Sequence, residues 1–440
     1  MPSSRDRFRQ ATAAGSEMDA TARFCLFGAA PDTPNLGVTA LHDSIVAGLR
    51  SKLQNCELTV FDFGRNRRPT ASTPITGIQR LGAQPTRRVW RPEALWNMRL
   101  ANRLGGAWNA GARSIRGASA VLDLSAGDSF SDIYGKRRYE AIAAPKHMAA
   151  DAGVPLVLLP QTYGPFRDLR IRADARSLVR TAAVAWARDP ASFEVLRDLL
   201  GEEFDDTRHR LGVDVAFGLP RVRPTLAISE RVESWLGDGA GPVVGINVSG
   251  LLYLDPDRAR SSFNLADDYA EMLKRLLKSL LVTNGVRVVL VPHALSPAGH
   301  PESDPEACAR LASDLPPADR ERVCVLDGPY RATEIKDLIA RLDWFCGARM
   351  HSTIAALSSG VPVAGMAYSP KFRGVYKLCD MDHRIVDLTR VDRVEGADQL
   401  LAAFEGRAAD RSRLAAALPA IMEVVDAQLE SIVQFGTTGA

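Results

Sequence analysis

The sequence lacks several features that would assign it to a broad class at once. It has no run of 18 apolar residues, so no transmembrane helix is expected. None of its six cysteines forms a C-x-x-C pair, and most lie in apolar, strand-like runs. This argues against a disulfide framework or a zinc cluster and favours reduced thiols in a cytoplasmic protein. Residues 1–20 have no apolar stretch and are predicted to be a disordered tail rather than a signal peptide.

The common catalytic fingerprints are missing as well. The chain has no P-loop, no G-x-G-x-x-G, no G-x-S-x-G elbow and no H-E-x-x-H. No group of residues has metal-ligand spacing, so neither a metal nor a cofactor is expected. The formal net charge of +3 is too small to indicate nucleic acid as a partner. With 46% hydrophobic and 24% charged residues, the composition is that of a globular protein.

Apolar segments and amphipathic helical patterns alternate along most of the 440 residues, which predicts an α/β fold. The apolar segments are continuous rather than alternating, as in parallel sheets that are covered on both faces. Proline and glycine gather between positions 220 and 242 and indicate an interdomain connection. We therefore expect two Rossmann-like domains facing each other across a cleft, at residues 21–220 and 242–396. A C-terminal helical segment at 397–440 would pack back on the body of the protein.

The strongest local pattern lies at residues 344–366. It predicts a short buried strand, a turn at Gly347, a helix that begins near Met350, and a second buried strand. Open parallel sheets bind ligands at the carboxyl ends of their strands, and a helix N-terminus favours an anion. Arg349 would add a planar donor fork and His351 a side chain that titrates near neutral pH. The alternative is a capping turn in which the histidine merely bonds a backbone carbonyl.

A polar loop of small residues follows a predicted strand at 120–124. Small residues permit close backbone approach to a ligand. Asp128 and Asp132 could then accept hydrogen bonds from sugar hydroxyls, or one could act as a base, with Ser129 beside them. Asp and Ser also favour helix caps, so an ordinary capping role is an equal alternative.

Three further strand ends carry polar side chains. Gln161 stands in a stiff loop after a strand at 155–159 and could be oriented toward a ligand. Arg188 could meet a second anionic group, or form a surface pair with Asp189 that contributes little energy. His293 could line the cleft, although a structural role is about as well supported.

Residues 65–116 hold eleven arginines, no lysine and a single acid, Glu93. Trp90, Trp96 and Trp108 are interleaved with them. A solvated helical face is the usual explanation for such a run of charge. The imbalance is large enough to suggest an anionic acceptor or peripheral contact with a membrane surface. Nucleic acid is less favoured, because no binding motif accompanies the arginines.

The order and spacing of these motifs resemble the polysaccharide pyruvyl transferase family. The resemblance spans roughly residues 23–385 and rests on segments in both halves of the chain. These are Asn35-Leu36-Gly37, residues 127–135, 161–166 and 188–192, then 245–249, 291–293 with Asp304, 347–351, and 368–371.

The resemblance implies a fold similar to GT-B glycosyltransferases, with no metal. It implies transfer of pyruvate from phosphoenolpyruvate onto two hydroxyls of one sugar, forming a cyclic ketal in cell-surface or exopolysaccharide biosynthesis. Arg188, Arg349 and His351 would hold the donor, and the acceptor would be a sugar or a lipid-linked oligosaccharide. On this view His351 is the proton donor and Asp128 a candidate base, while Asn35 and Met350 join the substrate-binding residues.

Two other functions remain open from the sequence. A GT-B glycosyltransferase that uses a nucleotide sugar would share the fold, the cleft and a cationic anion site. A non-catalytic member could instead use its arginine-rich segment to join a polysaccharide-assembly complex, although the presence of both Arg349 and His351 argues against this.

Overall fold

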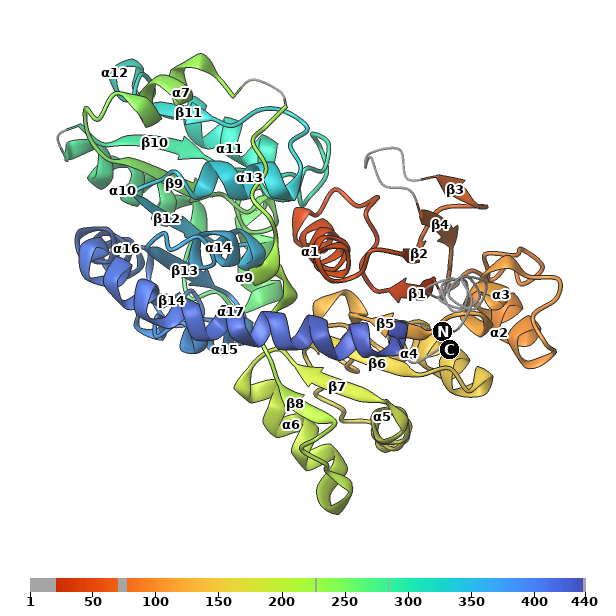
Figure 1. Ribbon diagram of the computed structural model, residues 1–440. Coiled ribbons are helices and arrows are strands. Elements are labelled where there is room, and N and C mark those ends of the chain that lie inside the picture. The colour runs from red at the N-terminus through yellow and green to blue at the C-terminus, as the bar shows by residue number, and fades with distance from the viewer. Residues whose placement is uncertain (1–20, 70–76, 226–227, 284, 438–440) are drawn as a thin grey trace, which may run out of the picture.

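The computed structural model describes residues 21–69, 77–225, 228–283 and 285–437, so the tail expected at 1–20 lies outside the described residues. Two sheets, each covered by helices, lie side by side with a long C-terminal helix running across both (Figure 1). The α/β class and the two Rossmann-like units predicted from the sequence are confirmed.

The N-terminal sheet has the strand order β3-β4-β2-β1-β5-β6-β7-β8 in the described residues, and every pairing except β3 with β4 is parallel. Its strands are β1 (Ala22–Phe27), β2 (Cys56–Asp62), β3 (Arg68–Pro69), β4 (Ile78–Gly82), β5 (Ala120–Asp123), β6 (Leu156–Gln161), β7 (Val184–Ala187) and β8 (His209–Leu211). Its helices are α1 (Leu36–Lys52), α2 (Leu95–Arg103), α3 (Ala110–Arg116), α4 (Lys136–Ala152), α5 (Leu169–Thr181) and α6 (Pro190–Leu200), with short 3-10 turns η1 (Ser125–Gly127), η2 (Gly201–Glu203) and η3 (Val215–Gly218).

The C-terminal sheet is parallel throughout and has the order β11-β10-β9-β12-β13-β14. Its strands are β9 (Val243–Asn247), β10 (Arg287–Leu290), β11 (Val323–Val325), β12 (Trp344–Gly347), β13 (Val363–Ala367) and β14 (Ile385–Asp387). The helices are α7 (Glu230–Gly237), α8 (Gly250–Tyr253), α9 (Pro256–Phe263), α10 (Tyr269–Val282), α11 (Asp304–Ser313), α12 (Pro317–Arg320), α13 (Ala332–Ile339), α14 (Met350–Leu357), α15 (Lys371–Leu378) and α16 (Arg393–Glu405), with η4 (Asp382–Arg384).

The central strands are buried along their whole length, as their continuous apolar sequences predict. This holds for β5, β6 and β7 in the first sheet and for β9, β10, β12 and β13 in the second. The strands at the sheet edges, such as β8 and β14, have only three residues each and are partly exposed. Short, half-exposed strands carry little hydrophobic signal, and the sequence pattern did not reveal them.

The C-terminal helix α17 (Arg407–Thr437) connects the two domains a second time. Near its start, Arg413 pairs with Asp380 at 2.9 Å on the C-terminal side. Near its end, Ser431 accepts a hydrogen bond from the indole of Trp186, and Gln428 accepts one from the amide of Val213. The helix therefore packs on both domains.

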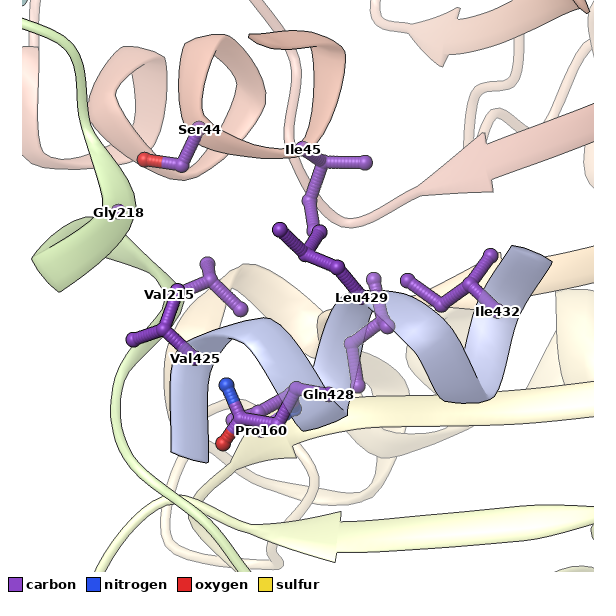
Figure 2. Close-up of a pocket in the computed structure, with 10 residues that line it drawn as sticks. Ser44, Ile45, Pro160, Val215, Gly218, Val425, Gln428, Leu429 and Ile432 are labelled. Atoms are coloured by element: carbon purple, nitrogen blue, oxygen red, sulfur yellow. The ribbon is translucent and has the colours of Figure 1, made fainter. Parts of the chain in front are cut away.

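The contact between α17 and α1 is close. Gly48 of α1 faces Leu429, and a Cβ at position 48 would approach the leucine to 2.4 Å. Figure 2 shows Ile45 of α1 and Val215 facing Leu429 and Val425 of α17. The cavity left among them measures about 10 Å³, which holds at most a single water molecule. This region is a packed interface and not a ligand site.

Candidate functional site

The two sheets face each other across a cavity of about 550 Å³. Its walls come from the carboxyl ends of parallel strands and from the helix starts that follow them, as expected for open α/β sheets. The lining includes Asn35, Asp128, Tyr134, Arg188, His293, Glu302, Arg349, Met350, His351, Tyr368 and Lys371. Residues more than 200 positions apart in the sequence therefore meet in one site.

Arg349 caps the start of α14 and is held by two buried partners. Its backbone amide donates to Oδ1 of Asn247 at 2.9 Å, and its guanidinium donates to Asp304 at 2.8 Å. Asp304 is fully buried and also accepts the backbone amides of Gly250, His293 and Ala294. Burial alone would lower the pKa of Arg349, but the Asp304 carboxylate outweighs it and raises the pKa. The arginine is thus a fixed cation on the cavity wall.

Arg188 follows β7 and is only 1% exposed. One nitrogen, Nη1, lies 3.4 Å from the carboxylate of Asp214. Its Nε and Nη2 have no hydrogen-bond partner within the described part of the chain. Buried N–H donors of a charged group are costly when unpaired. Because Arg188 lines the cavity, an anion bound there would satisfy them.

His351 stands in the first turn of α14, and its Nε2 lies 3.6 Å from Asp214. This is too long for a hydrogen bond but close enough for strong attraction. Burial would raise the pKa of Asp214, but the positive charges of His351 and Arg188 outweigh burial and lower it. Asp214 is therefore ionised near neutral pH and lies between the guanidinium of Arg188 and the ring of His351.

His293 lies beside this group but differs from it electrostatically. Burial, together with the positive charges of His351 and Arg349, lowers the pKa of His293 to about 3. The ring is consequently neutral at physiological pH and can offer the cavity either a donor or an acceptor nitrogen.

Asp128 follows η1 and joins the two domains electrostatically. Its carboxylate accepts from the ammonium of Lys371, at the start of α15, and from the hydroxyl of Tyr134 at 2.9 Å. Burial would raise the pKa of Asp128, but Lys371 and Arg188 lower it overall. In turn, burial would lower the pKa of Lys371, but Asp128 raises it. The pair is ionised and bridges the cavity.

The other residues singled out from the sequence divide into two groups. Asn35 and Met350 line the cavity, and Asn35 also caps α1 by accepting the amide of Gly37. Gln161, Asp132 and Ser129 are not among the lining residues in the described structure. Gln161 is fully buried and donates to the carbonyl of Asp123, while Asp132 accepts the amide of Asp168. Ser129 accepts from Arg138. These three residues shape the loops behind the site.

Sequence reasoning missed Asp214, Lys371 as a charged partner, and Tyr134. Asp214 follows β8, whose three residues gave no recognisable strand signal. Lys371 and Tyr134 gain their importance only from contacts across the cavity, more than 230 residues apart in sequence. No spacing rule identifies such contacts in a single sequence.

Within the described residues, no group of three or more His, Cys, Asp or Glu side chains could hold a metal ion. In the same residues, no helix is both long and apolar enough to cross a bilayer.

A family model for polysaccharide pyruvyl transferase matches residues 35–370, which is most of the chain and includes the lining of the cavity except Lys371 and Phe372. The chain belongs to the polysaccharide pyruvyl transferase family. The resemblance seen in the sequence motifs is thereby confirmed, and pyruvyl transfer to polysaccharide is supported at the level of the family.

A curated relative of this pyruvyl transferase family member is the amylovoran biosynthesis protein AmsJ of Erwinia amylovora. The two are 24% identical over 265 residues, which cover 59% of this chain. The chain matches only 59% of the relative's length.

Solved structures of similar shape support the fold. A UDP-N-acetylglucosamine 2-epimerase matches with a TM-score of 0.58 and 14% identity, over 96% of this chain and 98% of that one. A UDP-glucosyltransferase from Polygonum tinctorium matches with a TM-score of 0.54 and 14% identity, over 95% and 99%. At these identities the likeness concerns the fold alone. It confirms the GT-B-like arrangement of two Rossmann-like domains.

Proposed function

We propose that this family member transfers pyruvate from phosphoenolpyruvate to two hydroxyls of one sugar residue, forming a cyclic ketal in an exopolysaccharide or cell-surface polysaccharide. The observation that carries the proposal is the buried guanidinium of Arg188, whose Nε and Nη2 make no hydrogen bond beside a 550 Å³ cavity, with Nε only 3.7 Å from the carboxylate of Asp189. Arg349, Lys371 and His351 line the same cavity. Phosphoenolpyruvate, with a carboxylate and a phosphate, suits several cations at once.

The donor would bind with its two anionic groups between the domains. Arg188 has no hydrogen-bond partner at Nε and Nη2, and these two donors take one group by a bidentate contact. Arg349 is tied to Asp304, so it contributes charge from a fixed position, and the first turn of α14 adds N–H groups. Lys371 joins the phosphate when its contact with Asp128 opens. No metal is needed to neutralise the donor in this scheme.

His351 would supply the proton that starts the reaction. A protonated imidazole gives its proton to the methylene carbon of phosphoenolpyruvate, which becomes a methyl group, and the adjacent carbon becomes cationic. A sugar hydroxyl adds to that carbon. Inorganic phosphate then leaves with its bridging oxygen, and a second hydroxyl closes the ring. The two hydroxyl protons balance the equation, one replacing the proton spent on the methyl group and the other leaving with phosphate.

Asp128 would take a proton from the acceptor once Lys371 has moved to the phosphate. While paired with Lys371 the carboxylate is ionised but a weak base, because its pKa is lowered. Loss of the lysine contact raises its basicity at the moment when a hydroxyl must be deprotonated. Asp214 would keep Arg188 and His351 in place without touching the substrate.

A ligand-binding measurement tests the donor assignment. Phosphoenolpyruvate should raise the melting temperature of the wild-type protein by mass action, whereas a panel of nucleotide sugars should not. The shift should shrink in Arg188→Lys, which retains the charge but loses the bidentate donors. Arg172→Lys, at a half-buried arginine of α5 that pairs with Asp198 outside the cavity, is the matched control and should respond like wild type.

Measuring turnover in a His351 variant separates donor binding from the chemical step. In His351→Gln, phosphoenolpyruvate should still stabilise the protein, while release of phosphate in the presence of acceptor saccharide should stop. Stabilisation by a nucleotide sugar alone would instead establish a glycosyltransferase. Absence of any ligand response would support the non-catalytic alternative.

A further inference from the structure

The arginine-rich segment carries an apolar stripe that the body of the protein does not cover. On and just after α2, the side chains of Trp96, Leu100 and Leu104 recur every four residues and so lie on one helical face. They are 58%, 40% and 62% exposed. The opposite face of α2 is packed inward through Met98 and Ala101, which are fully buried. The helix is therefore anchored by one side and presents large apolar groups on the other.

Two further tryptophans flank the stripe. Trp90 is 73% exposed and Trp108 is 55% exposed. The side-chain amide of Asn109 donates to the carbonyl of Pro92 and to Oδ1 of Asn97. These bonds hold the chain beside Trp90, Trp96 and Trp108 together at one end of α2. We call the five residues Trp90, Trp96, Leu100, Leu104 and Trp108 the tryptophan face.

The tryptophan face is bordered by positive charge. Arg87 and Arg88 are exposed, and in the described residues neither lies within ion-pair distance of a carboxylate. Arg113 and Arg116 of α3 are exposed as well and donate only to backbone carbonyls. The one acid of the segment, Glu93, is buried. Large aromatic groups beside unpaired arginines suit an anionic, partly apolar surface, which is the chemistry of a lipid headgroup region.

The tryptophan face lies near a second cavity that adjoins the site. In Figure 1, α2 and α3 lie at the outer end of the N-terminal domain, away from the C-terminal sheet. A second, mostly apolar cavity of about 280 Å³ reaches from Phe63, Pro85 and Leu95, beside α2, to Val38 and Ala126. Val38 and Ala126 also line the 550 Å³ cavity. The two cavities are neighbours, and the smaller one lies between the site and the tryptophan face.

We propose that the tryptophan face docks this enzyme on an anionic lipid bilayer, and that the acceptor saccharide is carried on a lipid in that bilayer. The identity of the reaction rests on the proposed function, whereas the docking itself does not. The tryptophans and leucines enter the headgroup boundary while the arginines contact anionic headgroups. A membrane-bound saccharide then approaches the site from the α2 end of the domain, along the apolar cavity. The contact is peripheral and reversible.

Flotation with lipid vesicles tests the docking directly. The full chain should float with vesicles of phosphatidylglycerol and phosphatidylcholine at low salt, and should not float with phosphatidylcholine alone. Binding should weaken as salt is raised, because the headgroup attraction is screened. Arg87→Gln combined with Arg88→Gln should weaken binding roughly fivefold for each arginine removed. Arg170→Gln combined with Arg197→Gln, two exposed arginines elsewhere, should leave binding unchanged.

The apolar contribution needs its own variants. Trp96→Gln combined with Leu100→Gln should weaken vesicle binding by about tenfold or more. Leu169 and Val282 are each 80% exposed on other surfaces, so Leu169→Gln combined with Val282→Gln is the matched control. Both double variants should keep the phosphoenolpyruvate-dependent rise in melting temperature. They should differ only in vesicle binding and in transfer to a vesicle-borne acceptor.

Three outcomes would overturn the docking proposal. One is equal flotation of the tryptophan-face variant and the wild type. Another is concentration-dependent self-association without lipid that the same variant abolishes, since the face would then be an interface between copies of the chain. The last is binding that does not distinguish anionic from neutral vesicles. Vesicle binding without a phosphoenolpyruvate response would leave the docking intact and reject only the proposed reaction.

Discussion

The imidazole of His351 lies directly against Gly37 of the opposite domain: a Cβ at position 37 would stand 2.5 Å from Nδ1 of the ring. Gly37 belongs to the first turn of α1, whose cap residue Asn35 also lines the cavity. The glycine has no need of a left-handed backbone, so its value here is the space that it leaves. The position of the proposed proton donor thus depends on the absence of a side chain more than 300 residues away.

Gly37→Ala should therefore damage catalysis without unfolding the protein. Alanine suits a helix better than glycine, so the melting temperature should fall little. The imidazole must shift, and a displacement of this order should reduce pyruvyl transfer by about a hundredfold. Gly237→Ala, at the end of α7 where an added Cβ meets nothing within 4 Å, is the control. Equal activity of the two variants would mean that the placement of His351 is unimportant.

Asp304→Asn should be costly to stability. The carboxylate is fully buried and balances Arg349, while it also receives three backbone amides. An asparagine leaves the buried guanidinium without its counter-charge, which should lower the free energy of unfolding by about 3 kcal/mol. Urea denaturation measures this, with the more exposed Glu306→Gln on the same helix as the control. A loss no larger than that of the control would contradict the role given to the Arg349–Asp304 pair.

Stability should fall on mild acidification because of His293. Its pKa in the folded protein is about 3, well below the ordinary value of 6.5, so the unfolded chain binds the proton more readily. Below pH 6.5 each unit should cost up to about 1.4 kcal/mol, until the folded pKa is reached. His293→Gln should flatten this dependence, measured as urea midpoints from pH 7 to 5. His300→Gln removes an exposed histidine and should retain the wild-type slope.

The interaction free energy between Asp128 and Lys371, which lie in different domains, should be measurable. The pKa of Asp128 is lowered in the folded protein, so the contribution of its charge to stability is lost as the pH falls through the folded pKa of Asp128. The pKa of Lys371 is raised in the folded protein, so the contribution of its charge to stability is lost as the pH rises through the folded pKa of Lys371. A double-mutant cycle with Asp128→Asn and Lys371→Met should give about 1 kcal/mol from roughly pH 4 to 10. Coupling that does not weaken as the pH is lowered through the titration of Asp128 would show that charge is not its source.

Much of this architecture could be predicted from the sequence, because it depends on local patterns. Buried strands such as β7 and β12 are short apolar runs followed by polar turns, and their ends supplied Arg188, Arg349 and His351 as candidates. The family resemblance followed from the same segments.

The remaining features depend on contacts that the sequence does not display. Arg349 looked like a free anion ligand, but its guanidinium is tied to Asp304. Gln161 follows a strand like the other candidates, yet the strand continues through it and the side chain is buried behind the site. Asp214 follows an edge strand that is too short to give a recognisable strand pattern in the sequence. In each case the role of the residue depends on which way its side chain points and what it contacts, and a single sequence does not determine this.

The long helix α17 has a consequence for motion. The two domains are joined once by the chain before β9 and again by α17, which is held to the C-terminal side through Arg413 and to the N-terminal side through Gln428. Pro419 lies between these anchor points and removes one helical hydrogen bond. Two bodies joined at two places turn most freely about the line through both. A motion that opens the cavity is therefore restricted to rotation about one axis, and α17 bends most easily at Pro419, where a helical hydrogen bond is missing.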